Sequence, residues 1–273
     1  MTVINTNVSA LVAANASNNA SAMLQTAMER LSTGKRINSA EDDASGLAVS
    51  SKMQAALQGD TVAIRNANDG ISVAQTAEGA MGNVANILQR LSELAVESAN
   101  GTITDTDRSN LNVEVTQLLS QVNDIAAKTN FNGLNLLDGS QSGGFTLQVG
   151  IQASDTVTMA IGQMDTTTLG ISGISLATQS GATSALSAIN GAITSVASSR
   201  AKMGAYESRL QSTVSNLTST VSNLNASESR IEDADFSAET TNLAKAQILS
   251  QAATAMLAQA NQSQQSVLKL IQS

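Results

Sequence analysis

Residues 236–273 repeat small and apolar side chains at alternating steps of three and four. The repeat is carried by Ala246, Leu249, Ala253, Met256, Ala260, Ser263, Val267 and Leu270. This spacing predicts one long helix with a narrow, alanine-rich coiled-coil seam. At about 1.5 Å per residue the helix would be roughly 50 Å long, which is more than one small globular core covers. The segment therefore requires a partner helix from the other end of the chain or from another copy.

The start of the chain carries a similar repeat, formed by Val3, Ala10, Ala14, Leu24, Met28 and Leu31. We expect the two ends, residues 1–43 and 234–273, to pair as an inner terminal coiled coil. Small seam residues bury little apolar surface each, so the pair needs many further contacts to be stable. This favours an assembly over a lone domain.

Residues 44–233 are predicted to form an outer helical bundle. One apolar stripe runs through Ala74, Ala77, Met81, Val84, Leu88, Leu91 and Ala95, and further stripes span residues 111–125 and 186–224. Alternating residues predict a β-hairpin at about 145–161, and the Gly-, Ser- and Thr-rich residues 162–183 are expected to be a surface excursion. The predicted fold is mainly α, a long antiparallel helical bundle or coiled coil with a small β-hairpin region.

Three local patterns predict details of this bundle. Residues 39–42 and Thr104 with Asp107 have the shape of capping boxes, which predicts helices that start near Ala40 and after Thr104. Arg200 and Glu207 are the charged residues that interrupt the 186–224 stripe, and they lie one heptad apart. We expect them to pair with each other or with a neighbouring helix.

The composition argues against several functions. The chain has no His and no Cys, so the commonest general base and zinc ligands are missing, and we expect neither an enzyme nor a cofactor or metal site. Asp42 and Asp43 are better explained as partners of a helix N-terminus than as metal ligands. A net charge of -8 argues against nucleic acid. We find neither a cleavable signal peptide nor an apolar run that would span a membrane.

Several longer motifs resemble bacterial flagellin and occur in the order found in that family. They are LSTGKRINSA at 31–40, DDASGLA at 42–48, NDGIS at 68–72, QRLSELAV at 89–96, NFNGL at 130–134, SRIEDAD at 229–235 and AQANQ at 258–262. Gln264 and Ser208 depart from the family, which commonly has proline and asparagine there. The resemblance implies a short form in which residues 162–183 stand in place of the large variable outer domains.

The resemblance implies a subunit that polymerises into the bacterial flagellar filament for swimming motility. It implies export in an unfolded state by the flagellar type III apparatus, an extracellular location, and contacts with an export chaperone, a filament cap protein and hook-junction proteins. The expected polymerisation seam comprises Leu24, Met28, Leu31, Leu249, Met256, Val267 and Leu270. We expect the last four of these to contact the chaperone as well.

A second implication concerns the flagellin-sensing Toll-like receptor of animals. The family's recognition surface maps to Arg90, Leu94 and Glu114 in this sequence. The structural alternative is that Arg90 and Glu114 bridge neighbouring helices while Leu94 is buried. For the whole chain, the main alternative is a hook-filament junction or adaptor protein, which shares the terminal helices but does not polymerise indefinitely. A hydrolase that uses only Asp and Glu has no pocket signature here.

Overall fold

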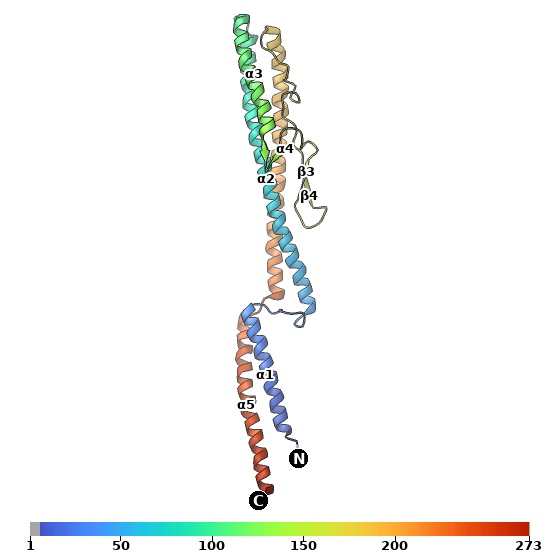
Figure 1. Ribbon diagram of the computed structural model, residues 1–273, viewed down its shortest axis with the longest axis vertical. Helices are drawn as coiled ribbons and strands as arrows, with labels where there is room; N and C mark the ends of the chain where they lie inside the picture. The colour runs from blue at the N-terminus through green and yellow to red at the C-terminus, as the bar shows by residue number, and fades with distance from the viewer. Residues whose placement is uncertain (1–5, 273) are drawn as a thin grey trace. The chain divides into compact units, whose positions relative to one another are not determined.

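The computed structural model describes residues 6–272, with side chains as far as Ser266. Within this part the helices are α1 (Val8–Thr33), α2 (Ala44–Ala99), α3 (Asp105–Lys128), α4 (Gln179–Glu232) and α5 (Phe236–Gln272). The strands are β1 (Asn130–Phe131), β2 (Leu134–Asn135), β3 (Phe145–Gln148) and β4 (Thr156–Met159), as labelled in part in Figure 1. The predicted fold class, mainly α with a small hairpin region, is confirmed.

The chain divides into two compact units. The terminal unit comprises residues 1–55 and 223–273, and the outer unit comprises residues 56–222. Both boundaries fall inside long helices, α2 and α4. The first turns of α2 and the last turns of α4 therefore belong to the terminal unit. The predicted boundaries, at 43/44 and 233/234, lie instead at the start of α2 and at the end of α4.

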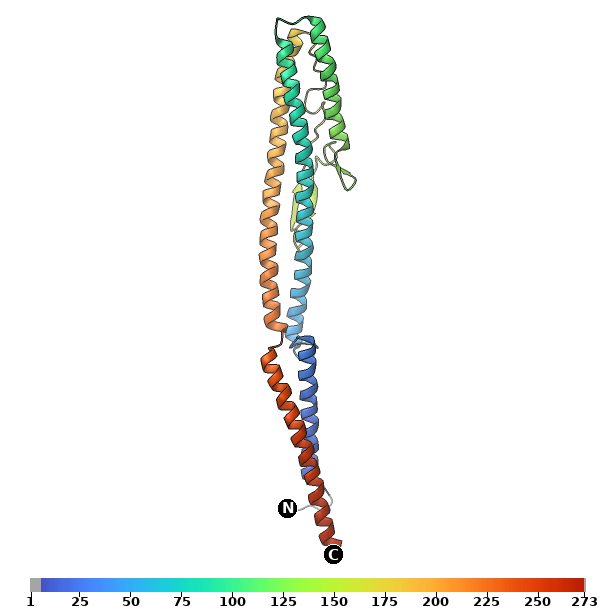
Figure 2. The same ribbon diagram turned by 90° about the vertical axis from the view of Figure 1, so that its left-hand side faces the viewer.

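In the terminal unit, α1 and α5 lie side by side and antiparallel (Figures 1 and 2). The side-chain amide of Asn7, the residue that caps α1, donates to the carbonyl oxygen of Ala260 at 3.1 Å. The contact between the helices is made mainly by alanines at heptad spacing, namely Ala13, Ala20 and Ala27 of α1 with Ala246 and Ala253 of α5, all buried. The predicted pairing of the two ends is therefore confirmed, and so are Ala246 and Ala253 of α5. In α1 the seam was wrong in part, because the buried alanines were not among the predicted residues and Met28 is 51% exposed.

One part of the predicted seam is wrong. The pattern placed Leu249 and Met256 in it, but these side chains are 42% and 63% exposed. The residues one position later, Ser250 and Leu257, are half-buried instead. The pattern favoured Leu249 because leucine is more apolar than serine. The helices pack through the face that carries Ala246 and Ala253, because alanines allow the backbones to approach closely.

Two connectors belong to the terminal unit: residues 34–43 join α1 to α2, and residues 233–235 join α4 to α5. Hydrogen bonds at the helix ends fix the first of them. The N–H of Gly34 donates to the carbonyl of Arg30 at 2.9 Å and ends α1. The α2 helix starts at Ala44, because the carboxylate of Asp43 accepts the N–H of Gly46 at 2.9 Å. The predicted start near Ala40 is wrong, since Asp42 closes a turn by accepting the N–H groups of residues 38 and 39.

The two connectors also bind each other. The N–H of Arg36 donates to the carbonyl of Glu232 at 2.6 Å, and the N–H of Ala234 donates to the carbonyl of Gly34 at 2.9 Å. The carboxylate of Glu232, which is largely buried, accepts Nζ of Lys35 at 2.6 Å and Oγ of Ser50 at 2.8 Å. These hydrogen bonds lower the pKa of Glu232. Glu232 thus ties the end of α4 to the start of the chain's first connector.

In the outer unit, α3 and α4 run beside α2 (Figure 2). Their large apolar side chains fill one core, which includes Met81, Leu88, Leu91 and Leu94 of α2, Val115 and Val122 of α3, and Ile189, Val196 and Met203 of α4. The predicted stripe of α2 is confirmed, since its members are all buried. Nη2 of Arg200 forms an ion pair with Oε1 of Glu78 on α2 at 3.1 Å. Of the two predicted alternatives, Arg200 therefore pairs with a neighbouring helix and not with Glu207.

Two hairpins pack beside these helices. The first turns at Asn132 and Gly133, whose φ angles of 48° and 79° suit the left-handed turn that joins β1 to β2. The second pairs β3 with β4 in antiparallel register, with Leu147 opposite Val157. The predicted hairpin at about 145–161 is therefore confirmed.

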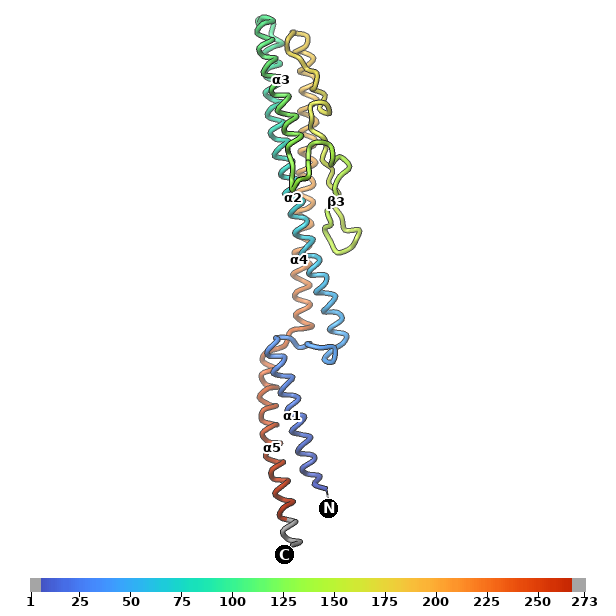
Figure 3. Tube along the Cα trace, viewed as in Figure 1, coloured from blue at the N-terminus to red at the C-terminus, as the bar shows by residue number. Residues whose placement is uncertain are grey.

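The expected surface excursion at residues 162–183 is wrong in part: residues 162–178 form a loop, as expected, but the loop packs apolar side chains inward. This stretch contains no strand, α4 already begins at Gln179, and apolar side chains such as Met164, Ile171 and Leu176 are buried. Figure 3 traces the segment along the bundle. Asparagines of α3 fix its backbone, because the side-chain oxygens of Asn123 and Asn112 accept the N–H groups of Thr166 and Leu176. The Gly-, Ser- and Thr-rich composition hid these widely spaced apolar residues.

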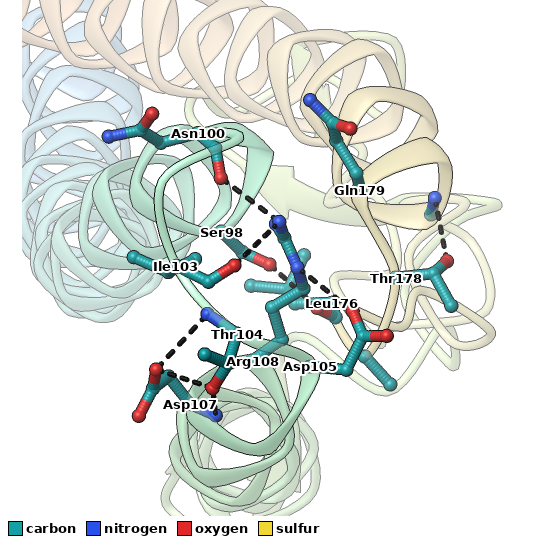
Figure 4. A network of polar contacts seen from close by, with 12 residues as sticks. Ser98, Asn100, Ile103, Thr104, Asp105, Asp107, Arg108, Leu176, Thr178 and Gln179 are labelled. Atoms are coloured by element: carbon teal, nitrogen blue, oxygen red, sulfur yellow. Dashed lines mark hydrogen bonds and ion pairs between the residues drawn. The ribbon is translucent and has the colours of Figure 1, made fainter.

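A buried arginine closes the turn between α2 and α3 (Figure 4). Nη2 of Arg108 donates to the carbonyl oxygens of Asn100 at 3.0 Å and Ile103 at 3.2 Å. Thr104 and Asp107 form the capping box that the sequence predicted. Together these contacts satisfy backbone groups that the ends of the two helices would otherwise leave unpaired.

We predict that Thr104→Ala lowers the free energy of unfolding by about 1 kcal/mol, because the N–H of Asp107 in the first turn of α3 loses its acceptor. Urea denaturation measures this loss. Thr106→Ala is the matched control, since Thr106 is exposed in the same turn and its replacement favours the helix slightly. Equal effects of both substitutions would contradict the role of the cap.

We predict that Glu232→Gln destabilises the chain by about 1 kcal/mol at neutral pH, because the charged hydrogen bonds to Lys35 and Ser50 are lost. The lowered pKa of Glu232 means that its contribution is present above the unfolded-state value of about 4.3. It disappears as the pH falls through the folded-state value.

The unfolding temperatures of the wild type and of the Glu232→Gln variant should therefore become equal at acid pH. The exposed Glu41→Gln serves as the control. A difference that stays constant down to acid pH would show that Glu232 acts through packing alone.

Candidate functional site

A groove between α1 and α5 is an open apolar surface of the terminal unit. It has a volume of about 490 Å³ and is lined by Val8, Ser9, Val12, Ala13, Ala16, Leu249, Ala252, Ala253 and Met256. The alanines of the seam form its floor, and the larger side chains of both helices form its walls. A surface of this kind is typical of a site for another protein chain.

The two helices expose more apolar side chains outside the groove. Further large apolar side chains are exposed on these two helices, namely Leu11, Met23, Met28, Phe236 and Ile248. We call these residues and those of the groove the terminal apolar surface. Covering a side chain of this size stabilises an assembly by about 1.5–3 kcal/mol, so the surface gains substantially from a partner.

The residues of the predicted seam fall into three groups. Leu24 and Leu31 are half-buried beside the α1–α5 contact, whereas Met28, Leu249 and Met256 are exposed and belong to the terminal apolar surface. Val267 and Leu270 lie in the backbone of α5, but their side chains are outside the described residues. The roles of all seven residues as polymerisation contacts stay predictions.

Sequence reasoning missed part of this surface. Val8, Leu11, Val12 and Ile248 did not fit the stripe that was chosen for each helix. Val8, Leu11 and Val12 nevertheless lie at positions i, i+3 and i+4, which place side chains on one side of a helix. A search for a second apolar stripe on the same helix would have found them.

The predicted receptor residues lie on the outer unit. Nε of Arg90 on α2 pairs with Oε1 of Glu114 on α3 at 2.9 Å, and Nη1 pairs with Glu93 at 3.0 Å. The hydrogen bond to Glu114 raises the pKa of Arg90. Leu94 is only 1% exposed in the core, so its side chain offers no recognition surface on the folded bundle. A surface role for Leu94 is thus incompatible with its burial.

The described residues contain no group of three or more Asp, Glu, His or Cys side chains that would hold a metal ion. In the same part of the chain, no helix combines the length and hydropathy that a membrane span requires. The terminal apolar surface therefore remains the strongest candidate for function.

Comparison with protein families agrees with the motifs. The N-terminal helical region of bacterial flagellin matches residues 4–142, and the C-terminal helical region of bacterial flagellin matches residues 186–271. The two matches together include most of the chain.

Individual relatives cover the chain almost completely. It is 43% identical to the flagellar filament core protein flaB2 of Brachyspira hyodysenteriae, over 99% of this chain and all of that protein. It is 41% identical to flagellin of Halalkalibacterium halodurans, over 90% of this chain and 91% of that one. The crystal structure of Bacillus cereus flagellin matches with a TM-score of 0.51 and 32% identity, covering 60% of this chain and 94% of that one. The chain therefore belongs to the bacterial flagellins, which are structural filament proteins and not enzymes.

Proposed function

We propose that this flagellin polymerises through its terminal apolar surface into a filament that serves swimming motility. The observation that carries the proposal is the arrangement of α1 and α5. These helices bury alanines against each other and leave Leu249, Met256 and the valines of α1 exposed. A second copy that covers these side chains supplies the burial that the pair lacks.

The geometry of such contacts favours an open polymer. When a surface on α1 and α5 meets a different surface on the next copy, the contact is heterologous. A contact of this kind can repeat from copy to copy, whereas the contact in a symmetric dimer is used up by two copies. Copies joined in this way form a helical tube whose inner layer is made by the terminal helices.

The same weak pairing suits export in an unfolded state through the flagellar type III apparatus. Alanines bury little apolar surface, so the α1–α5 pair gains most of its stability on assembly. We infer that an export chaperone covers Leu249, Met256, Val267 and Leu270 on α5 before assembly. A filament cap protein and hook-junction proteins would then meet the subunit outside the cell, where the filament lies.

The alternative function is that of a hook-filament junction or adaptor protein. Such a protein would share α1 and α5 but would stop at a small oligomer. Relatives named as flagellin or filament core protein that match at 41–43% identity support the polymerising subunit instead. The extent of polymerisation separates the two functions.

A second role that we propose is recognition of the monomer by the animal receptor. The exposed ion pair of Arg90 with Glu114 supports it, because charged residues on a rigid helix pair offer directional contacts. Val96 and Val113 are exposed on the same two helices and add apolar area. Leu94 would support this surface from below, by packing.

We predict that Leu249→Gln combined with Met256→Gln prevents filament growth. Loss of about 3 kcal/mol per contact raises the critical concentration for polymerisation by on the order of a hundredfold. Seeded growth followed by light scattering and electron microscopy measures this. Gln251→Ala combined with Gln262→Ala is the control, because these exposed residues lie on the opposite face of α5. Normal growth of the first variant would exclude the terminal apolar surface as the contact.

We predict that Arg90→Ala weakens receptor activation by the monomer about tenfold or more in a reporter cell assay, because a charged contact at a binding surface is lost. Arg200→Ala is the matched control, since it also removes an exposed ion pair between two helices. Such pairs contribute little to stability. Full activity of the Arg90 variant would count against recognition at this surface.

A further inference from the structure

The methionines that the structure describes differ sharply in exposure. Met23, Met28 and Met256 are 41%, 51% and 63% exposed, and all three lie on α1 or α5. Met53 of α2 is half-buried. The methionines of the outer unit are at most 3% exposed, namely Met81, Met159, Met164 and Met203. The most exposed thioethers thus lie on the two helices through which the subunit is proposed to polymerise.

Met256 forms part of the wall of the apolar groove between α1 and α5. The other residues that line this groove are valines, alanines, a leucine and Ser9, whose hydroxyl is the one side-chain donor among them. A thioether suits such a surface because it is apolar and polarisable. A strongly polar group in its place would have almost no hydrogen-bond donor once a second copy covers the groove.

Peroxides convert a thioether into a strongly polar group. A lone pair of the sulfur attacks one oxygen of hydrogen peroxide, the O–O bond breaks and an S–O bond forms. The other oxygen leaves as hydroxide and takes up the remaining proton to become water, so the sulfur is oxidised and the peroxide is reduced. Methionine sulfoxide reductases reverse this oxidation. Because the chain has no Cys and no Trp, methionine is its most readily oxidised side chain.

We propose that Met256 is a site of reversible oxidation by peroxide that controls addition of the subunit to the polymer, with Met23 and Met28 as further sites on the same helix pair. This inference rests on the proposed polymerisation through the terminal apolar surface. In the free subunit the three thioethers are open to solvent, whereas a copy that covers the groove shields Met256. An oxidised subunit is therefore excluded from growth, and a subunit already in the filament is protected.

The sulfoxide acts on the contact between copies in two ways. It makes the end of the Met256 side chain polar, and it adds an oxygen that loses its water when a second copy covers the groove. An unpaired polar group at a buried contact raises the critical concentration for polymerisation by on the order of tenfold or more. The outer unit keeps its fold, because its methionines are buried within one copy.

The first test locates the oxidised residues by peptide mass spectrometry, after brief exposure of the full-length monomer to dilute hydrogen peroxide. We expect one added oxygen at each of the three exposed methionines before any at Met81 or Met203. In filaments grown beforehand, Met256 should react several-fold more slowly than in the monomer. Equal rates at Met256 and Met203 in the monomer would overturn the proposal. Equal rates at Met256 in monomer and filament would also overturn it, even though filaments had formed.

The second test measures growth from filament seeds by light scattering, with untreated monomer and with peroxide-treated monomer. Treatment should raise the critical concentration about tenfold or more, and incubation with methionine sulfoxide reductases should restore growth. Undiminished growth of monomer whose Met256 is fully oxidised would overturn the proposal, while the proposed function would stand. Failure of the untreated monomer to grow would instead refute the proposed function and this inference with it.

Substitution identifies the methionine responsible. Met256→Leu keeps an apolar side chain of similar volume but has no sulfur. Each protein is compared with its own untreated sample, so a change in basal growth does not enter the comparison. Peroxide should inhibit Met256→Leu several-fold less than the wild type, and adding Met23→Leu and Met28→Leu should remove the remaining inhibition.

Met203→Leu is the matched control, since it removes a buried methionine of the outer unit. It should stay as sensitive to peroxide as the wild type. Inhibition of Met256→Leu equal to that of the wild type would overturn the assignment to Met256.

Discussion

The small side chains between α1 and α5 determine how the terminal unit behaves. Ala20, Ala27 and Ala246 fill the centre of the contact. Leucines such as Leu24 and Leu257 are only half-buried beside it, and several other large side chains face outward. Alanine buries little apolar surface, so the pair has little stability of its own. Leu249 and Met256 remain available to a neighbouring copy. Order in the terminal helices and assembly of the polymer are therefore coupled.

The outer unit is built in the opposite way. Its core contains large side chains such as Met81, Leu88 and Ile189, which are fully buried within a single copy. The segment after β4 adds Ile171 and Leu176 to this core. A unit that buries its own apolar surface keeps its shape whether or not a neighbour is present. It is thus suited to carry exposed features of the subunit, such as the ion pair of Arg90 with Glu114.

The sequence predicted those elements whose cause is local. The long helices, the hairpin, the Thr104 cap and the seam alanines of α5 each follow from residues close together in the chain. The sequence-based predictions failed where a residue far away in the chain determines the structure. Periodicity could not tell whether Leu249 or Ser250 faces α1, and it could not show that Leu94 is buried in the core of the outer unit. The burial of apolar side chains in residues 162–178 depends on asparagines of α3, which accept backbone N–H groups of that segment.

The most direct test of assembly through the terminal unit is electron microscopy of the full chain and of a chain that lacks residues 238–273, both after addition of filament seeds. The deletion removes nearly all of α5 but leaves the core of the outer unit unchanged. We predict long tubes from the full chain, and from the shortened chain a folded outer bundle that adds no length to the seeds. Tubes from the shortened chain, or only small oligomers from the full chain, would contradict polymerisation through α1 and α5.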